Sequence, residues 1–369
     1  MSLAFYRKYR PQKMDELVGQ ESTTQIIRNA ARADRLGHAY LFYGPRGTGK
    51  TSTARLIAKL LNCEKRKLDK KFHTEGEPCN ECVSCKEIES GFSFDVVEID
   101  AASNRGIDEI RNLKDAVRTA PAKGGSKVYI IDEVHMLTGP AWNALLKTLE
   151  EPPAHAVFVL ATTEFEKVPP TITSRAQRFV FKKIPKIKIL EKLKIIVAAE
   201  NISIDDDALE IVAASGDGSF RDAESLLDQL SSAGEKINVA IAENLTGRTG
   251  LKKVSELTRM ILEGKTGDAL THLHRLNDEG VNLAALAKDL IHYLRKVLAI
   301  KTNPSLEKFF ENELTAEEIN QLKKLTALSD TETQIKFLKS LITAYTEIRY
   351  SPFPIVPLEV AVIENKRVP

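Results

Sequence analysis

The chain contains the sequence Gly44-Pro45-Arg46-Gly47-Thr48-Gly49-Lys50-Thr51, which matches the pattern G-x-x-x-x-G-K-[ST] at every fixed position. The apolar residues 41–43 before it are typical of the end of a buried strand, and residues 52–61 after it have the apolar spacing of a helix. In this context the glycines let backbone N–H groups wrap a polyphosphate at the N-terminus of the helix. The alternative is a glycine-rich helix cap without a ligand.

This loop predicts a site for ATP and Mg²⁺. Lys50 is placed to contact the β- and γ-phosphates, and the hydroxyl of Thr51 is placed to bind Mg²⁺. The other nucleotide contacts predicted from the loop are Gly44, Pro45, Gly47, Thr48, Gly49 and Ser52.

A second predicted strand ends in two carboxylates. The apolar run 127–131 is typical of a strand buried on both faces, and it leads into Asp132 and Glu133. Since the carboxyl ends of parallel strands face the ligand crevice, Asp132 is placed to hold Mg²⁺ and Glu133 to orient and polarise an attacking water. The alternative is that the two carboxylates only cap the helix predicted at 141–150. Together with Lys50, the pair predicts ATP hydrolysis.

A third apolar run, residues 156–161, ends in Thr162 and Thr163. Their hydroxyls would lie beside the γ-phosphate if this strand neighbours the other two, so Thr163 is a candidate catalytic residue. Arg175 and Arg221 follow in two later segments. On the residues alone, each is an arginine of the kind that forms a surface ion pair.

All four cysteines lie in one segment, at Cys63, Cys79, Cys82 and Cys85. Two successive C-x-x-C steps let thiolates converge on one tetrahedral ion, and Cys63 completes the set from the end of the preceding helix. This predicts a closed structural Zn²⁺ site; a pair of disulfides and an Fe–S cluster are the alternatives. His73 is expected to be a solvated residue rather than a ligand, close to a charged, mobile loop at 64–71.

Length and composition indicate a globular protein of several domains. The 369 residues exceed one ordinary core, and the net charge of +2 is nearly balanced, so any nucleic-acid contact must be local. No run approaches the about 18 apolar residues of a membrane helix, and the first residues are not followed by an apolar signal segment. We therefore expect a cytoplasmic protein without membrane contact.

The pattern of predicted elements changes along the chain. Residues 1–180 alternate between strands and helices, which predicts an α/β domain with a mainly parallel sheet and the cysteine segment, residues 63–85, inserted. Strand patterns fade after that, and we predict a small helical lid over 181–246 and an all-α domain over 247–369. An assembly surface and an ordinary bundle core fit the helical faces of the last domain equally well.

Several motifs, taken in order, resemble those of the bacterial DNA polymerase III gamma/tau clamp-loader family. The phosphate loop and the four cysteines are joined by Tyr9-Arg10-Pro11, Val18-Gly19-Gln20, Ile131-Asp132-Glu133-Val134-His135-Met136-Leu137, Ser174-Arg175 and Gly218-Ser219-Phe220-Arg221-Asp222-Ala223. The match covers roughly the first 230 residues. It implies an AAA+ ATPase domain with an inserted zinc module, followed by a lid and a helical collar through which subunits assemble.

The resemblance also implies roles for single residues. Arg175 matches an arginine that reaches the ATP of the neighbouring subunit, although Ala176 stands where the family usually has a cysteine. Arg221 matches a lid arginine that contacts the γ-phosphate of its own subunit, and Thr163 matches the first sensor position. The residues that match the surroundings of the adenine are Val18, Tyr9, Arg10 and Pro11.

The function implied by the resemblance is that of an ATPase subunit of the DNA polymerase III clamp loader, which loads a ring-shaped sliding clamp onto primed DNA for replication. The implied partners are delta-type and delta-prime-type subunits, further copies of this chain, the clamp and DNA. The implied location of this assembly is the nucleoid. Candidates for contacts with DNA phosphates are Lys114, Arg118 and Lys123, although each of them singly is better explained as a charge on a solvated helix face. A nucleotide-binding scaffold that does not hydrolyse ATP is the alternative. A branch-migration or helicase motor of related fold would lack the four cysteines.

Overall fold

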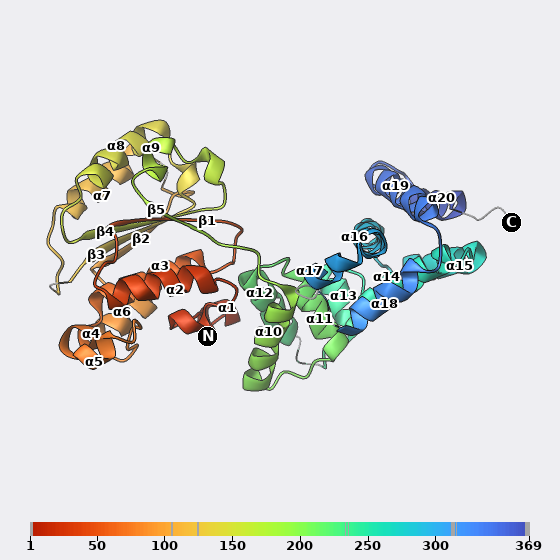
Figure 1. The fold of residues 1–369 in the computed structure, drawn as a ribbon, viewed down its shortest axis with the longest axis horizontal. Coiled ribbons are helices and arrows are strands. Elements are labelled where there is room, and N and C mark those ends of the chain that lie inside the picture. Colours follow the sequence, from red (N-terminus) through yellow and green to blue (C-terminus); the bar gives the residue numbers. More distant parts are fainter. Residues whose placement is uncertain are drawn as a thin grey trace. The chain divides into compact units, whose positions relative to one another are not determined.

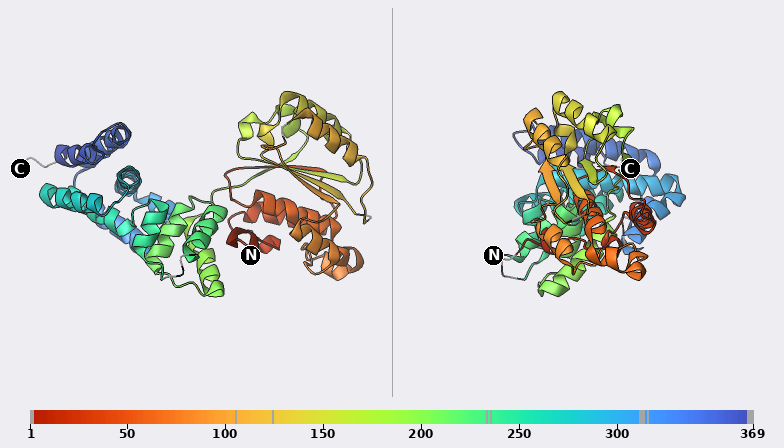
Figure 2. Two further views of the ribbon diagram at one scale, coloured as in Figure 1. Left: turned by 180° about the vertical axis from the view of Figure 1, so that it is seen from behind. Right: turned by 90° about the vertical axis from the view of Figure 1, so that its left-hand side faces the viewer.

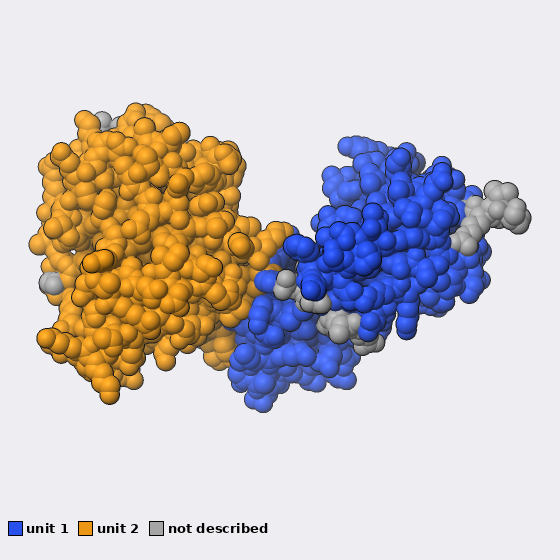
Figure 3. All heavy atoms as spheres, in the orientation of Figure 1, with its two compact units in different colours: residues 1–5, 185–218, 222–369 blue, residues 6–184, 219–221 orange. Residues whose placement is uncertain are grey.

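The computed structural model describes residues 3–365 apart from 105, 124, 233, 235, 311–313 and 315. The chain forms two compact units (Figure 3). One unit consists of residues 6–184 together with 219–221, and the other contains the rest of the described chain. Residues 219–221 therefore belong with the unit that carries the phosphate loop, although they follow it at a long distance in the sequence.

The first unit is built on a five-stranded parallel sheet in the order β2-β3-β4-β1-β5 (Figure 1). The strands are β1 (Ala39–Tyr43), β2 (Val96–Asp100), β3 (Lys127–Asp132), β4 (Ala156–Thr162) and β5 (Gln177–Val180). Because all strands are parallel, their carboxyl ends lie at one edge of the sheet. The central order β3-β4-β1 places the ends of these three strands next to one another. This meets the condition under which Thr163, directly after β4, was expected to lie near the other two strand ends.

Helices cover both faces of this sheet (Figures 1 and 2). Alternate strand residues feed two cores: Tyr40 and Phe42 of β1 point to one face, whereas Ala39 and Leu41 point to the other. The first core is closed by α2 (Glu21–Arg32), α3 (Lys50–Asn62) and α6 (Val83–Ser90). The second is closed by α7 (Ile107–Val117), α8 (Gly139–Glu150) and α9 (Pro170–Thr173). Burial on both faces explains why β3 and β4 are continuous apolar runs in the sequence.

Several short helices connect these elements. They are α1 (Phe5–Lys8), η1 (Met14–Glu16), α4 (Glu64–Leu68), α5 (Lys70–His73), η2 (Val134–Met136) and η3 (Phe165–Lys167). The expectation of a charged loop at 64–71 is wrong, since α4 and α5 form there. Arg66 is the physical reason, because its buried guanidinium donates hydrogen bonds to the carbonyl oxygens of Leu60 at 3.2 Å and Ala31 at 3.0 Å.

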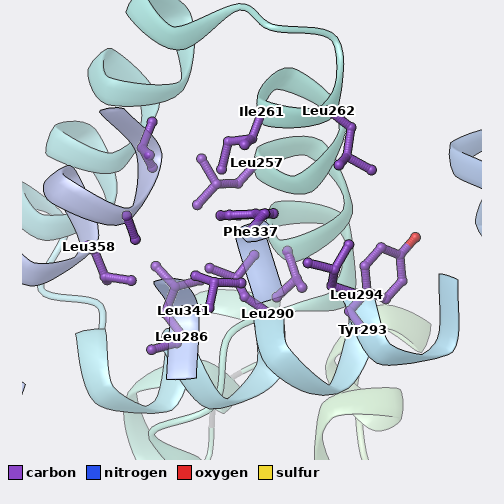
Figure 4. Close-up of a cluster of buried hydrophobic side chains, with 14 of the residues drawn as sticks. Leu257, Ile261, Leu262, Leu286, Leu290, Tyr293, Leu294, Phe337, Leu341 and Leu358 are labelled. Atoms are coloured by element: carbon purple, nitrogen blue, oxygen red, sulfur yellow. The ribbon is translucent and has the colours of Figure 1, made fainter. Parts of the chain in front are cut away.

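The second unit is helical. Its elements are α10 (Lys186–Glu200), α11 (Asp206–Ser215), α12 (Phe220–Ser231), α13 (Val239–Thr246), α14 (Leu251–Leu262), α15 (Thr266–Asp278), α16 (Leu283–Thr302), η4 (Pro304–Leu306), α17 (Glu307–Phe310), α18 (Ala316–Thr326), α19 (Thr331–Ile348) and α20 (Val356–Glu364). The last seven α-helices share one hydrophobic core, in which Phe337 of α19 lies among leucines of α14, α16 and α20 (Figure 4). Within the described residues, no helix is both long and apolar enough to cross a membrane.

Candidate functional site

The phosphate loop connects β1 to α3 through three glycines with positive φ. Gly44, Gly47 and Gly49 have φ values of +141°, +71° and +102°. A Cβ atom on Gly44 would lie 2.0 Å from the carbonyl oxygen of Phe181, so the backbone passes too close to its neighbour for any side chain. The loop is closed by Thr48, whose hydroxyl donates to the carbonyl oxygen of Pro45 at 2.8 Å. Ser52 lies half-buried in the first turn of α3.

Lys50 folds back over this loop. Its Nζ donates hydrogen bonds to the carbonyl oxygens of Gly44 at 2.8 Å and of Pro45 at 2.7 Å. Burial lowers the pKa of Lys50, and the nearby charges of Asp132 and Glu133 oppose this shift. A polyphosphate in the loop would offer the buried ammonium group stronger acceptors than two neutral carbonyl groups.

The two predicted magnesium ligands are already in contact. The hydroxyl of Thr51 donates to Oδ2 of Asp132 at 2.7 Å, and the backbone N–H of Glu133 donates to Oδ1 at 2.9 Å. The carboxylate of Asp132 is therefore fixed at the end of β3, beside the first turn of α3. A hydroxyl and a carboxylate oxygen at this spacing form a donor set that suits Mg²⁺.

Glu133 is held by the neighbouring strand. It has φ +48° and ψ +43°, a left-handed conformation that turns the chain sharply out of β3. The hydroxyl of Thr163 donates to Oε2 of Glu133 at 3.0 Å. The sequence did not single out His135, whose Nε2 lies 3.1 Å from Glu164 and whose Nδ1 lies 3.5 Å from Glu133. Its signal in the sequence was its place within the motif of residues 131–137, two residues after Glu133.

Arg221 belongs to residues 219–221, the short segment that lies with the sheet unit beside the phosphate loop. The backbone N–H of Phe220 donates to the carbonyl oxygen of Gly47 at 3.1 Å. A Cβ atom on Gly47 would lie 3.3 Å from Cβ of Arg221, so Arg221 starts beside the loop. The guanidinium of Arg221 lies over the ring of Tyr6, 5.1 Å from its centre.

Gln20, for which no role was predicted, connects the phosphate loop to the residues that follow β5. Its amide donates to the carbonyl oxygens of Thr48 at 3.3 Å and Lys182 at 2.9 Å, and its oxygen accepts the backbone N–H of Lys182 at 3.2 Å. Val18 immediately precedes the Gly19-Gln20 pair. Of the other predicted adenine neighbours, Tyr9 and Pro11 are half-buried.

Arg10 lies in the same N-terminal segment. Burial lowers the pKa of its guanidinium, and the charge of Arg55 adds to the effect. Arg55 of α3 is itself paired with Glu98 in the middle of the edge strand β2, and its Nη2 lies 2.6 Å from a carboxylate oxygen of Glu98. The carbonyl oxygen of Arg10 accepts a hydrogen bond from the side-chain amide of Gln12 at 3.1 Å.

The contacts of Arg175 are with α8 and α9. Its Nη2 lies 2.7 Å from a carboxylate oxygen of Glu150, and its Nη1 donates to the carbonyl oxygen of Thr171 at 2.7 Å. The side chain is 36% exposed, so it can exchange this surface ion pair for another acid or phosphate. The following residue, Ala176, packs against the second core of the sheet unit.

The four cysteines converge on one point, between α3 and α6. Their Sγ atoms lie within 4.8 Å of one another, and none forms a disulfide. Tetrahedral thiolates at about 2.3 Å from a zinc ion are about 3.8 Å apart, so the spacing fits such an ion. The hydrogen bond between Cys63 and Cys85 lowers the pKa of Cys63 and raises the pKa of Cys85, so the metal-free pair shares a proton that a bound cation would displace. His73 faces Asp34 instead, at 2.8 Å.

The positions of the proposed DNA contacts differ from one another. Lys123 lies 2.6 Å from a carboxylate oxygen of Glu87, so its charge is already paired. Arg118 is exposed at the C-terminus of α7, and Lys114 is half-buried in its last turn.

Three models of DNA polymerase III subunits match consecutive parts of the chain. The model described as "DNA polymerase III, delta subunit" covers residues 19–185. The clamp-loader ATPase lid domain covers residues 188–236, and domain III of the gamma and tau subunits covers residues 237–367. With the parallel sheet and the helical second unit, these matches confirm the predicted fold class. The predicted boundary at 246 stays a prediction.

Individual proteins resemble the chain over most of its length. DNA polymerase III subunit tau of Bacillus subtilis is 44% identical over 362 residues, which are 98% of this chain and 62% of that protein. DNA polymerase III subunit gamma of Buchnera aphidicola is 36% identical over 359 residues, 97% of this chain and 96% of that protein. The RuvB branch migration motor of Thermotoga maritima aligns with a TM-score of 0.45 at 18% identity, over 69% of this chain and 79% of that one. The relatives found by sequence show the family of this chain, whereas the alignment with RuvB is too distant to bear on it.

Proposed function

Because this chain belongs to the DNA polymerase III gamma/tau family, as its motifs indicated, we propose that it is an ATPase subunit of a clamp loader. It would use ATP binding and hydrolysis to load a ring-shaped sliding clamp onto primed DNA during replication. The observation that carries the proposal is the pair of hydrogen bonds at the strand ends, from Thr51 to Asp132 and from Thr163 to Glu133. The first contact holds Asp132 beside the start of α3, and the second holds the carboxylate of Glu133 at the end of β4.

Each residue of the site has a proposed step. Lys50 exchanges the carbonyl groups of the loop for the β- and γ-phosphates, while Thr51 and Asp132 hold Mg²⁺, which neutralises charge on the phosphates. Glu133 orients the attacking water and accepts its proton, and Thr163 keeps the carboxylate in position for this. The backbone N–H groups of the loop, at the N-terminus of α3, surround the phosphates.

Two arginines complete the proposed site. Arg221 contacts the γ-phosphate of its own subunit, which requires its guanidinium to leave the ring of Tyr6. Arg175 reaches the ATP of the neighbouring subunit and stabilises the charge of the transferring phosphate. Its exposed position and its exchangeable pair with Glu150 support this role.

The proposed assembly contains further copies of this chain and subunits of the delta and delta-prime types. The sliding clamp and primed DNA are its substrates, and the cytoplasm, at the nucleoid, is its proposed location. For the cysteine cluster we propose a structural Zn²⁺ ion bound by Cys63, Cys79, Cys82 and Cys85, because four soft ligands with this spacing form a closed tetrahedral site. The side chains around Val18 and Tyr9 to Pro11 are proposed to surround the adenine.

One substitution separates this proposal from a scaffold that binds ATP without hydrolysing it. Glu133→Gln keeps the size of the side chain and its hydrogen bond from Thr163 but removes the proton acceptor. We expect ATP affinity to stay within about twofold and turnover to fall about a hundredfold or more, the usual range for losing a general base. Glu166→Gln, an exposed acid on η3, is the matched control. Equal turnover in the two variants would remove Glu133 from its role.

A further inference from the structure

The cysteine module (residues 63–85) touches the N-terminal segment (residues 9–18) at two backbone groups. Nδ2 of Asn80 donates to the carbonyl oxygen of Gln12 at 2.9 Å. The carboxylate of Glu77 accepts the backbone N–H of Met14 at 2.8 Å. Glu77 is only 8% exposed and is also paired with Arg28 of α2. Both contacts are made by side chains of the module, and both fix the path of the segment rather than one of its side chains.

A buried lysine joins the module, the segment and the helix of the phosphate loop. Lys59 lies on α3 and its side chain is 2% exposed. Its Nζ donates to Oδ1 of Asn80 at 2.9 Å and to the side-chain oxygen of Gln12, and it lies 3.4 Å from Glu89. Because a buried ammonium group is costly without partners, this cluster resists separation of Asn80 from Gln12.

The position of Asn80 depends on the cysteines. Asn80 follows Cys79 directly and has φ +59°, a left-handed conformation that asparagine tolerates. The Sγ of Cys79 accepts hydrogen bonds from the backbone N–H groups of Glu81 at 3.5 Å and of Cys82 at 3.3 Å. These bonds form a turn that brings the thiols of Cys79 and Cys82 to the same side. The cysteine cluster therefore sets the direction in which the amide of Asn80 points.

The other end of the segment lies against the phosphate loop. Leu17 is buried, and its Cδ2 would be 3.3 Å from a Cβ atom on Gly49. Two hydrogen bonds shape the chain between: Leu17 N–H donates to the carbonyl oxygen of Met14 at 3.2 Å, and Val18 N–H to that of Glu16 at 3.1 Å. A shift at Gln12 or Met14 is thus passed through one turn of 3₁₀ helix to Val18, the proposed neighbour of the adenine.

We propose that the metal-loaded cysteine module positions the N-terminal segment against the nucleotide base, so that metal binding and ATP affinity are coupled. The inference rests on the proposed function, because it takes residues 9–18 as neighbours of the adenine. Asn80 and Glu77 are positioning residues, since they act through the backbone of Gln12 and Met14. Coupling between two ligands is reciprocal, so ATP also raises the affinity of the module for the metal by the same factor.

The test compares two near-isosteric changes within one turn of the module. Asn80→Asp keeps the left-handed conformation and the acceptor for Lys59, but it replaces the donor to Gln12 by a carboxylate oxygen. Glu81→Gln, at an exposed neighbouring position, is the control. Calorimetry measures the binding of ATP and of inorganic tripolyphosphate to the full chain, and metal analysis checks that zinc is retained. Hydrogen exchange of residues 10–18 reports the order of the segment directly.

We expect Asn80→Asp to weaken ATP binding about fivefold, the worth of one hydrogen bond, and to leave tripolyphosphate binding unchanged. Exchange in residues 10–18 should rise in this variant, and removal of zinc by a chelator from the native chain should produce the same two effects. ATP affinity and exchange equal to those of Glu81→Gln would overturn the inference. If the native chain bound neither ATP nor tripolyphosphate, the proposed function itself would fail.

Discussion

Replacement of Gly47 by alanine should disturb the contact between the phosphate loop and the segment that carries Arg221. Gly47 has φ +71°, and a Cβ atom there would lie 1.8 Å from Oγ and 2.8 Å from Cβ of Ser219. Ser219 is 4% exposed, so its side chain has little free space into which to move. Either the loop or residues 219–221 must shift.

The size of the effect follows from two costs. A left-handed conformation costs a residue with a Cβ about 1–2 kcal/mol, and forcing an extra methyl group into a packed site costs about 1–3 kcal/mol. The shift changes the direction of the loop N–H groups and the distance from Arg221 to the γ-phosphate. We expect ATP affinity to fall at least about tenfold, which corresponds to roughly 1.4 kcal/mol.

Calorimetric titration with ATP measures this change. Gly139→Ala is the matched control, because a Cβ atom at Gly139 meets nothing within 4 Å and its φ is not positive. Adding Ser219→Gly to Gly47→Ala removes the atoms in conflict and should restore part of the affinity, leaving the backbone cost. Native affinity in Gly47→Ala, or no recovery in the double variant, would refute the steric reasoning.

Three further predictions concern other parts of the chain. Thr163→Val should lower ATP turnover about tenfold with little change in ATP affinity, because Glu133 loses its hydrogen bond, whereas Thr163→Ser should retain most of the turnover; equal rates would contradict this. Asp289→Asn should raise the free energy of unfolding by about 1 kcal/mol at pH 7 and by less near pH 4. Denaturant titrations at the two pH values measure both changes. Acidification should release zinc from the cysteine cluster, in a metal-release titration, since protons compete for the thiolates; retention at pH 4 would contradict thiolate ligation.

The sign of the Asp289 effect follows from its surroundings. Burial raises the pKa of Asp289, and its Oδ2 has no hydrogen-bond partner within the described part of the chain. The folded state therefore binds the proton more tightly than the unfolded state. The resulting stabilisation is complete below the unfolded pKa and is lost as the pH rises through the folded pKa. An asparagine carries no charge to bury, so its advantage grows with pH; a variant that is less stable than the native chain at pH 7 would contradict this.

The sequence was most informative where the relevant residues are neighbours in the chain. Local spacing was enough to predict the phosphate loop, the pair Asp132 and Glu133, and the cysteine segment. The continuous apolar runs were enough to predict strands that are buried on both faces of a sheet. A helical last domain was also predicted, because the apolar residues of α14, α16 and α19 recur at helical intervals.

Contacts between distant segments were not predictable in the same way. The return of residues 219–221 to Gly47 depends on how the chain leaves β5, which no local pattern records. Lys59 has the charge of a surface residue in the sequence, and only the fold brings Gln12, Asn80 and Glu89 around it. Within the predicted helical domains, α13 and α20 were not identified individually, because their eight and nine residues are largely apolar and show little helical alternation.

Steady-state ATP hydrolysis by the assembled complex tests the central claim most directly. The chain is mixed with the partner subunits, sliding clamp and primed DNA, and the native protein is compared with Arg175→Ala and with an equal mixture of Arg175→Ala and Glu133→Gln. We predict that clamp and DNA stimulate native turnover, that each variant alone binds ATP without this turnover, and that the mixture regains part of it. Recovery would come from interfaces that pair an intact Glu133 with an Arg175 from the neighbour. Native protein that binds ATP without stimulated turnover, or Arg175→Ala with native turnover, would contradict the account.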